Sequence, residues 1–219
     1  MNGVLQTPAR GWMAPIRVPL LLSLLFGLGY PLVDARFPGL AAIIAKGAGV
    51  GLLALAAALA RHWWLAAIMA FGALGDVLLE LPGLFFIGAG AFAVGHCIAM
   101  VFYACQRRPG LAPLDRVAAT ALIGFGLAMP ALVMPEGAAI GPLMLYAVLL
   151  CGMAVAALLS RFAPFGTGLG ALLFVISDTL IFIRMGGAFV GSPLIHGLII
   201  WYSYYLGQAL IFAGVMARR

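Results

Sequence analysis

A chain of 219 residues that is 65% hydrophobic and only 8% charged lacks the polar side chains needed to cover a water-soluble globule. This composition indicates a helical protein that crosses a membrane several times. The formal charge of +6 is carried by single or paired basic residues between apolar runs. That pattern is typical of membrane loops, and it excludes nucleic acid as a partner.

Eight apolar runs follow one another along the chain, each near the ~20 residues that a helix needs to cross the hydrocarbon. Charges, prolines and glycine turns separate them. The runs are 16–33, 40–60, 63–81, 84–105, 117–134, 142–160, 166–184 and 194–216. We therefore expect an all-α, polytopic membrane protein with one eight-helix domain over residues 1–219. The first run is too long for a typical signal-peptide core, so we expect it to remain as a span.

The arginines between these runs predict the orientation of the bundle. If the N-terminus is cytoplasmic, the same side receives Arg10, Arg17, Arg61, Arg107, Arg108, Arg116, Arg161, Arg218 and Arg219. The other side receives only Arg36 and Arg184. Because cytoplasmic loops are enriched in basic residues, both termini are predicted to be cytoplasmic. Aromatic residues that we expect at the interfaces are Trp12, Trp63, Trp64 and Trp201.

A small set of polar residues lies inside the spans, where such groups are expensive and by default mark a functional site. The set is Lys46, Asp76, Glu80, His96, Tyr146, Ser177, Asp178, Arg184, His196, Tyr202, Tyr204, Tyr205 and Gln208. At about 1.5 Å per residue, its deeper members lie roughly 6 to 21 Å below the non-cytoplasmic helix ends. We expect a tapering polar cavity that opens toward that side.

Asp76 and Asp178 are the strongest candidates in this set, because a short carboxylate cannot extend to the interface as a long side chain can. Two carboxyl groups in a partly dry pocket favour acid–base chemistry, in which one group keeps its proton and the other is ionised. With His96 they could instead supply three metal ligands, although no zinc-binding spacing is present. Ser177 is a weak nucleophile candidate, since no G-x-S-x-G motif surrounds it.

The remaining charged members have simpler interpretations. Lys46 could extend to the interface, and Glu80, Arg184 and His196 lie close enough to helix ends to be interfacial. His96, if it is not functional, is a neutral imidazole bonded between helices. The cysteines lie within apolar runs and predict neither a disulfide framework nor a metal site; they are Cys97, Cys105 and Cys151.

The chain resembles the YhhN family of lysoplasmalogenase-like integral membrane proteins over nearly its whole length. The motifs that carry the resemblance are Lys46, Gly75-Asp76, 92–96 (FAVGH), Tyr146, 173–178 (LFVISD) and 204–211 (YYLGQALI). Two positions depart from the family pattern: Gly47 stands in place of a proline, and Ala99 in place of a tyrosine. Tyr103, one turn further on, could take the place of that tyrosine.

The resemblance implies hydrolysis of the vinyl-ether bond of lysoplasmalogens, which releases a fatty aldehyde and a glycerophospho-alcohol. It implies a lysoplasmenyl-ethanolamine or lysoplasmenyl-choline substrate, membrane lipids as partners, no cofactor, and a place in the bacterial inner membrane. Asp76, Asp178 and His96 are then the expected catalytic residues. The expected substrate-binding residues are Lys46, Glu80, Tyr146, Ser177, Tyr204, Tyr205 and Gln208.

Vinyl ethers resist hydroxide but cleave after protonation at carbon, which creates an oxocarbenium ion that water captures. This reaction needs a positioned general acid and a nearby anion, the roles that two carboxyl groups share in glycoside hydrolysis. Two alternatives remain open, a metal-dependent lipid hydrolase and a lipid-binding or proton-coupled transporter. Similar cores around Asp76 and Asp178, four spans apart, could reflect a duplicated four-helix unit of the kind found in transporters.

Overall fold

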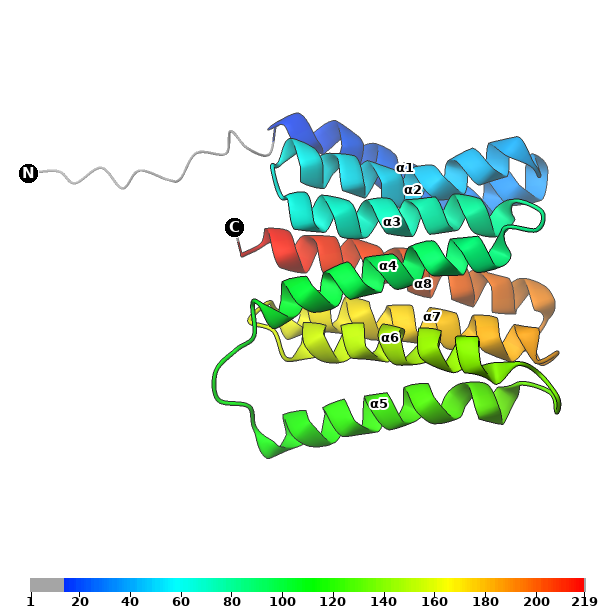
Figure 1. Cartoon of the computed structure of the whole chain (residues 1–219). Coiled ribbons are helices and arrows are strands. Elements are labelled where there is room, and N and C mark those ends of the chain that lie inside the picture. Colours follow the sequence, from blue (N-terminus) through cyan, green and yellow to red (C-terminus); the bar gives the residue numbers. More distant parts are fainter. Residues whose placement is uncertain (1–13, 219) are drawn as a thin grey trace, which may run out of the picture.

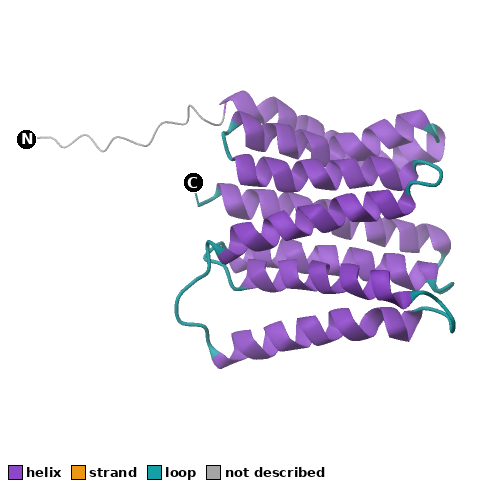
Figure 2. Cartoon of the chain, viewed as in Figure 1, coloured by secondary structure: helices purple, strands orange, loops and turns teal. Residues whose placement is uncertain are grey.

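The computed structural model describes residues 14–218, which form a bundle of eight long helices lying side by side (Figure 1). They are α1 (Ala14–Arg36), α2 (Leu40–Leu59), α3 (Trp63–Glu80), α4 (Phe85–Ala104), α5 (Pro113–Val133), α6 (Ile140–Leu158), α7 (Leu169–Met185) and α8 (Pro193–Met216). A π-helical turn, Pro164–Gly168, leads into α7. No strand occurs in this part of the chain (Figure 2).

All eight helices are long and apolar enough to cross a membrane, which confirms the predicted all-α architecture. Most predicted boundaries differ by one to four residues, and two of the differences occur at charged residues. The helix expected over 16–33 continues through Asp34 to Arg36. The helix expected over 117–134 begins earlier, at Pro113, because the Asp115 carboxylate accepts a hydrogen bond from the Ala112 N–H and caps the first turn. In both cases the charged residue that ended the apolar run lies inside the helix.

Two of the predicted interfacial tryptophans, Trp63 and Trp64, are exposed near the start of α3. Trp201 is not interfacial, since it is only 4% exposed and its indole N–H donates to the Gly27 carbonyl at 2.7 Å. That bond ties α8 to α1. The predictions for Arg10, Trp12 and Arg219 lie outside the described residues.

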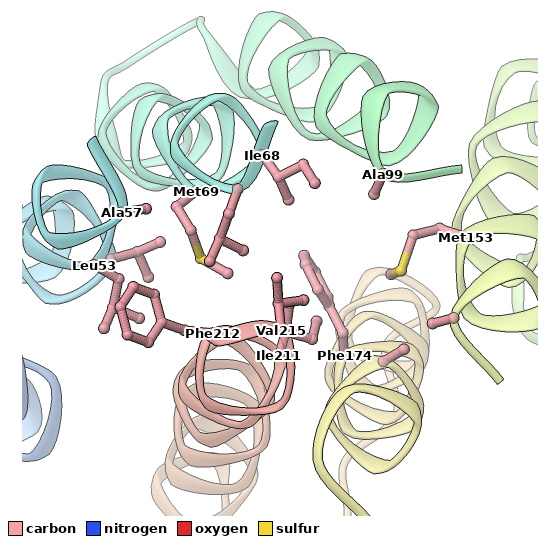
Figure 3. Close-up of a cluster of buried hydrophobic side chains, with 14 of the residues drawn as sticks. Leu53, Ala57, Ile68, Met69, Ala99, Met153, Phe174, Ile211, Phe212 and Val215 are labelled. Atoms are coloured by element: carbon pink, nitrogen blue, oxygen red, sulfur yellow. The ribbon is translucent and has the colours of Figure 1, made fainter. Parts of the chain in front are cut away.

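The half of the bundle nearest the described chain ends is filled by apolar side chains. Figure 3 shows this cluster, in which Met69 of α3, Phe174 of α7, Phe212 of α8 and Met153 of α6 converge on the bundle axis. Such close packing separates this end of the bundle from the other half. The other half, toward the opposite helix ends, is where the polar residues gather.

Glycines bring α7 and α8 into close contact. A Cβ atom on Gly170 would lie 2.5 Å from the Gly207 carbonyl oxygen, and one on Gly214 would lie 2.5 Å from the Thr167 nitrogen. Only residues without side chains allow two helices to approach so closely, as is common within membranes. The crossing holds the polar face of α7 next to that of α8.

Candidate active site

A cavity of about 840 Å³ opens at the helix ends that face away from the described chain ends. Residues from every helix except α5 line it, and Asp76 and Asp178 are both among them. These carboxylates are buried, at 2% and 5% exposure. The structure therefore brings together the two carboxylates that the sequence singled out, in a space of the size that lipid-like ligands need.

Asp76 lies on α3 and accepts a hydrogen bond from a tyrosine of α8. The Tyr204 hydroxyl donates to Asp76 Oδ2 at 2.8 Å, and Gln208 Nε2 lies 3.4 Å from the Tyr204 oxygen. Gly75, which precedes the aspartate, makes room for the Phe92 ring, because a Cβ atom there would lie 2.5 Å from it. The ring packs edge-to-face against Tyr204, with centroids 5.7 Å apart, and so supports the tyrosine.

Asp178 lies on α7 and has a similar arrangement with different helices. The Tyr146 hydroxyl of α6 donates to Asp178 Oδ2 at 2.6 Å. His96 of α4 places Nε2 3.5 Å from the same hydroxyl oxygen. Each carboxylate thus accepts one tyrosine hydrogen bond at Oδ2, and each tyrosine has one further polar neighbour behind it.

His96 and Gln208 do not line the main cavity. They line a second, much smaller cavity, which Phe92 separates from the first by contributing to both walls. The role of each toward a substrate in the main cavity is therefore indirect, through Tyr146 for His96 and through Tyr204 for Gln208.

Lys46 and Glu80 both line the main cavity and form an ion pair with each other. The Lys46 ammonium also lies 5.7 Å from the centre of the Tyr30 ring, within range of a cation–π contact. Its charge is therefore largely compensated by Glu80, which is exposed at the cavity rim. Lys46 does not extend freely toward the interface.

Tyr205 does not reach the main cavity, contrary to the substrate-binding role expected for it. Its ring is fully buried, and its hydroxyl lies 3.0 Å from Ser23 Oγ. The ring packs directly against Gly27, where any side chain would overlap it. Ser177 does line the cavity, but its hydroxyl donates to the Ile200 carbonyl at 3.0 Å. Both residues join α8 to a neighbouring helix.

His196 is not interfacial, because its side chain is fully buried. The Val190 N–H donates to its Nδ1 at 2.9 Å, so the remaining ring proton is on Nε2 and is donated to the Leu180 carbonyl, also at 2.9 Å. The neutral imidazole thereby fixes the loop between α7 and α8 beside the cavity mouth.

Three residues of the cavity wall escaped the sequence analysis or were interpreted differently. Asp34 lines the wall but follows the end of the predicted first span, and Tyr30 lies within that span as one more aromatic residue. Arg184 was interpreted as interfacial, yet its side chain lines the cavity while remaining exposed. The sequence did offer two signals: the polar hydroxyl of Tyr30, and the charges of Asp34 and Arg184 near the ends of their helices.

The described residues contain no group of three or more His, Cys, Asp or Glu side chains placed to hold a metal ion. His96, proposed as a third ligand beside the two aspartates, lies on the second cavity and is directed at Tyr146. The buried carboxylates on the main cavity are therefore Asp76 and Asp178, each bonded by a tyrosine hydroxyl, an arrangement suited to proton transfer.

Comparisons with known proteins agree with this picture of a membrane enzyme. Proteins named lysoplasmalogenase from Mycobacterium bovis and Mycobacterium tuberculosis are each 33% identical to this chain over 181 residues, which covers 76% of this chain and 67% of the relative. No solved structure matches the chain. The YhhN family matches residues 41–215, a range that includes both cavity aspartates. The protein therefore belongs to the YhhN family.

Proposed function

We propose that this protein hydrolyses the vinyl-ether bond of lysoplasmalogens and releases a fatty aldehyde and a glycerophospho-alcohol. The relatives named lysoplasmalogenase support a lysoplasmalogenase-like hydrolase. The observation that carries the proposal is that Asp76 and Asp178, both buried, line one cavity that is large enough for a lysolipid. Acid-catalysed cleavage of a vinyl ether needs such a pair and needs no nucleophilic side chain.

The reaction begins with proton transfer from one carboxyl group to the vinyl carbon. The second, ionised carboxylate stabilises the oxocarbenium ion and then takes a proton from the attacking water, which gives a hemiacetal. The hemiacetal collapses to the aldehyde and the glycerophospho-alcohol. Since Oδ2 of each aspartate accepts a tyrosine hydrogen bond, Oδ1 is the oxygen that carries the transferable proton. Both aspartates have an environment suited to the general acid of the first step.

The cavity mouth supplies charges for the head group. Arg184 forms no ion pair within the described residues, whereas Lys46 is engaged by Glu80. Arg184 lies roughly 9 Å beyond Asp178 along α7, at about 1.5 Å per residue. Five bonds separate the ether oxygen of the substrate from its phosphorus, which is about 6 Å in an extended chain that advances ~1.25 Å per bond. A phosphate at Arg184 therefore lets the vinyl ether reach the aspartates.

The alkyl chain of the substrate lies between α4 and α6. Phe86 of α4 and Leu145 of α6 line the cavity, and their side chains are 71% and 64% exposed. Near their other ends the two helices pack closely, since a Cβ atom on Gly152 would lie 2.9 Å from Met100 Sδ. Figure 1 shows α4 running obliquely to α6. We expect a lipid to enter the cavity from the bilayer between these two exposed side chains.

The test replaces each aspartate by its neutral isostere. Asp76→Asn and Asp178→Asn should each lower aldehyde release from lysoplasmenyl-ethanolamine by at least about 100-fold, the lower end of general acid–base contributions. The amide oxygen still accepts the tyrosine bond, so both variants should elute as folded protein. Glu136→Gln, an exposed carboxylate between α5 and α6, is the control and should retain activity. Near-normal turnover in both aspartate variants would overturn the two-carboxylate mechanism.

Chelation separates this mechanism from a metal-dependent one. Because the proposed steps use only carboxyl groups and water, EDTA should leave the rate of aldehyde release unchanged. Mass spectrometry of the incubated lysolipid provides the measurement. Loss of activity with EDTA and its recovery with zinc would favour a metallohydrolase, and unchanged lipid with saturable binding would favour a lipid-binding or transport protein.

A further inference from the structure

A second cavity, of about 10 Å³, lies behind the aromatic side chains that close the inner end of the main cavity. Phe92 forms this partition, since it lines both cavities, and it packs edge-to-face against Phe174 of the second cavity, with ring centroids 5.8 Å apart. The polar side chains on its far side are His96, Tyr103 and Gln208. The volume is close to the minimum that holds one water molecule.

Two polar atoms in the walls of this cavity have no hydrogen-bond partner among the described residues. They are the hydroxyl oxygen of Tyr103 and Oε1 of Gln208, whose side chains are 0% and 2% exposed. A buried polar group without a partner is destabilising, and such atoms commonly bind an internal water. Two of them on one small cavity make a shared ligand the simplest explanation.

The neighbouring hydrogen bonds fix the orientation of the Gln208 amide. Tyr204 gives its only proton to Asp76, so its oxygen can only accept from Gln208. The amide nitrogen must therefore face Tyr204. Oε1 is left on the side of the small cavity, where it can accept a hydrogen bond.

The same reasoning fixes the tautomer of His96. Tyr146 gives its only proton to Asp178, so its oxygen accepts from Nε2–H of His96. Nδ1 of the neutral ring is then without a proton, and it is an acceptor. The residues that line the cavity thus offer one donor, the Tyr103 hydroxyl, and two acceptors, Gln208 Oε1 and His96 Nδ1.

We infer that one water molecule occupies the small cavity, accepting a hydrogen bond from Tyr103 and donating to Gln208 Oε1 and His96 Nδ1. This arrangement satisfies both unpartnered atoms and gives the water three bonds, the usual number for a buried water. The hydrogen bonds then form two chains in which each group donates to the next. One chain leads from Tyr103 through the water and Gln208 to Tyr204 and Asp76. The other leads from the same water through His96 to Tyr146 and Asp178.

Tyr103 touches neither carboxylate, yet through the water it holds both tyrosine hydroxyls in the donor role. It is therefore a positioning residue for the two aspartates. The inferred water site does not depend on the proposed reaction. Thermal unfolding of the purified protein tests it without any substrate. A negative result for the water site is therefore distinct from a failure of the proposed function.

Tyr103→Phe gives opposite results for a hydrated and a dry cavity. With the water present the substitution removes one of its bonds, and the unfolding temperature should fall. In a dry cavity the substitution removes an unsatisfied hydroxyl, and the unfolding temperature should rise. An increase therefore overturns the inference.

A double-mutant cycle tests whether Tyr103 and Gln208 share one ligand. Tyr103→Phe combined with Gln208→Leu should lower the unfolding temperature by less than the sum of the single effects, because both act on the same water. Tyr205→Phe is the matched control: its hydroxyl contacts Ser23, so its effect should add to that of Gln208→Leu. Additive effects for Tyr103 and Gln208 would mean that no water joins them.

A kinetic measurement reports on the positioning role. Tyr103→Phe should lower kcat for aldehyde release several-fold with KM unchanged, because substrate contacts remain while the aspartates lose their alignment. An unchanged kcat together with the expected thermal coupling would keep the water but overturn its positioning role.

Discussion

The two carboxylates owe their similar settings to helices that are not equivalent. Asp76 on α3 accepts a hydrogen bond from Tyr204 of α8, and Asp178 on α7 accepts one from Tyr146 of α6. A tyrosine hydroxyl is a strong donor on a rigid ring, so it fixes the position of a buried carboxylate at a small cost in conformational entropy. The tyrosines therefore prepare the site before any lipid enters.

Arg184 offers a prediction about head-group recognition. Arg184→Gln should raise KM for a lysolipid about tenfold with little change in kcat, since one charge-assisted bond to phosphate contributes ~1.5–3 kcal/mol to binding substrate and transition state alike. Arg184→Lys should show a smaller increase. Initial rates over a range of lysolipid concentrations provide the measurement. Arg36→Gln, in the last turn of α1 and absent from the cavity wall, should leave KM unchanged. An unchanged KM in Arg184→Gln would show that the head group binds at another position.

The sequence was sufficient to predict the carboxylate pair and a set of polar residues around it, but not which tyrosine bonds which carboxylate. An aspartate in an apolar span has few explanations other than function, so Asp76 and Asp178 could be identified from their types and depths alone. Tyr204 and Tyr205 could not be told apart in this way. Neighbouring residues of a helix point about 100° apart, and only the packed structure shows that Tyr204 faces the cavity and Tyr205 faces α1.

At the level of the helices, the number of spans was predictable because lipid forces every backbone group to bond within its own helix. The ends were less predictable, since a charged residue can lie inside a helix, as Asp34 does in α1 and as Asp115 does in the first turn of α5, which it caps. Burial of Trp201 depended on its contact with Gly27, which is remote in sequence, and burial of His196 depended on how the loop after α7 folds back onto it.

The crossing of α7 and α8 provides a prediction about packing. Gly170→Ala places a methyl group 2.5 Å from the Gly207 carbonyl oxygen, so the helices must separate and the unfolding temperature should fall by several degrees. Activity should fall too, because Asp178 and Tyr204 lie on these helices. Gly124→Ala on α5 meets open space and is the control. It should be neutral or slightly stabilising, since alanine favours helices by up to ~1 kcal/mol. Equal behaviour of the two variants would contradict the close crossing.

On the scale of the whole molecule, the bundle has two unlike halves. Apolar side chains fill the half near the described chain ends (Figure 3), and the main cavity occupies the other. In a protein built in this way the polar site opens toward one face, and close apolar packing separates it from the opposite face. This division fits an enzyme that takes a lipid from one leaflet, and it is unfavourable for transport through the bundle axis.

The face on which the cavity opens follows from the distribution of arginines, which predicts cytoplasmic termini and thus a mouth on the outer side. Cysteine labelling tests this in a variant whose native cysteines are replaced, because two of them are exposed. In intact cells a membrane-impermeant maleimide should label Glu136→Cys, in the loop between α5 and α6. It should label Ala217→Cys, after α8, only when the membrane is permeabilised. The reverse pattern would place the mouth in the cytoplasm. The predicted pattern means that substrate enters from the outer leaflet, with the head group remaining on that side throughout the reaction.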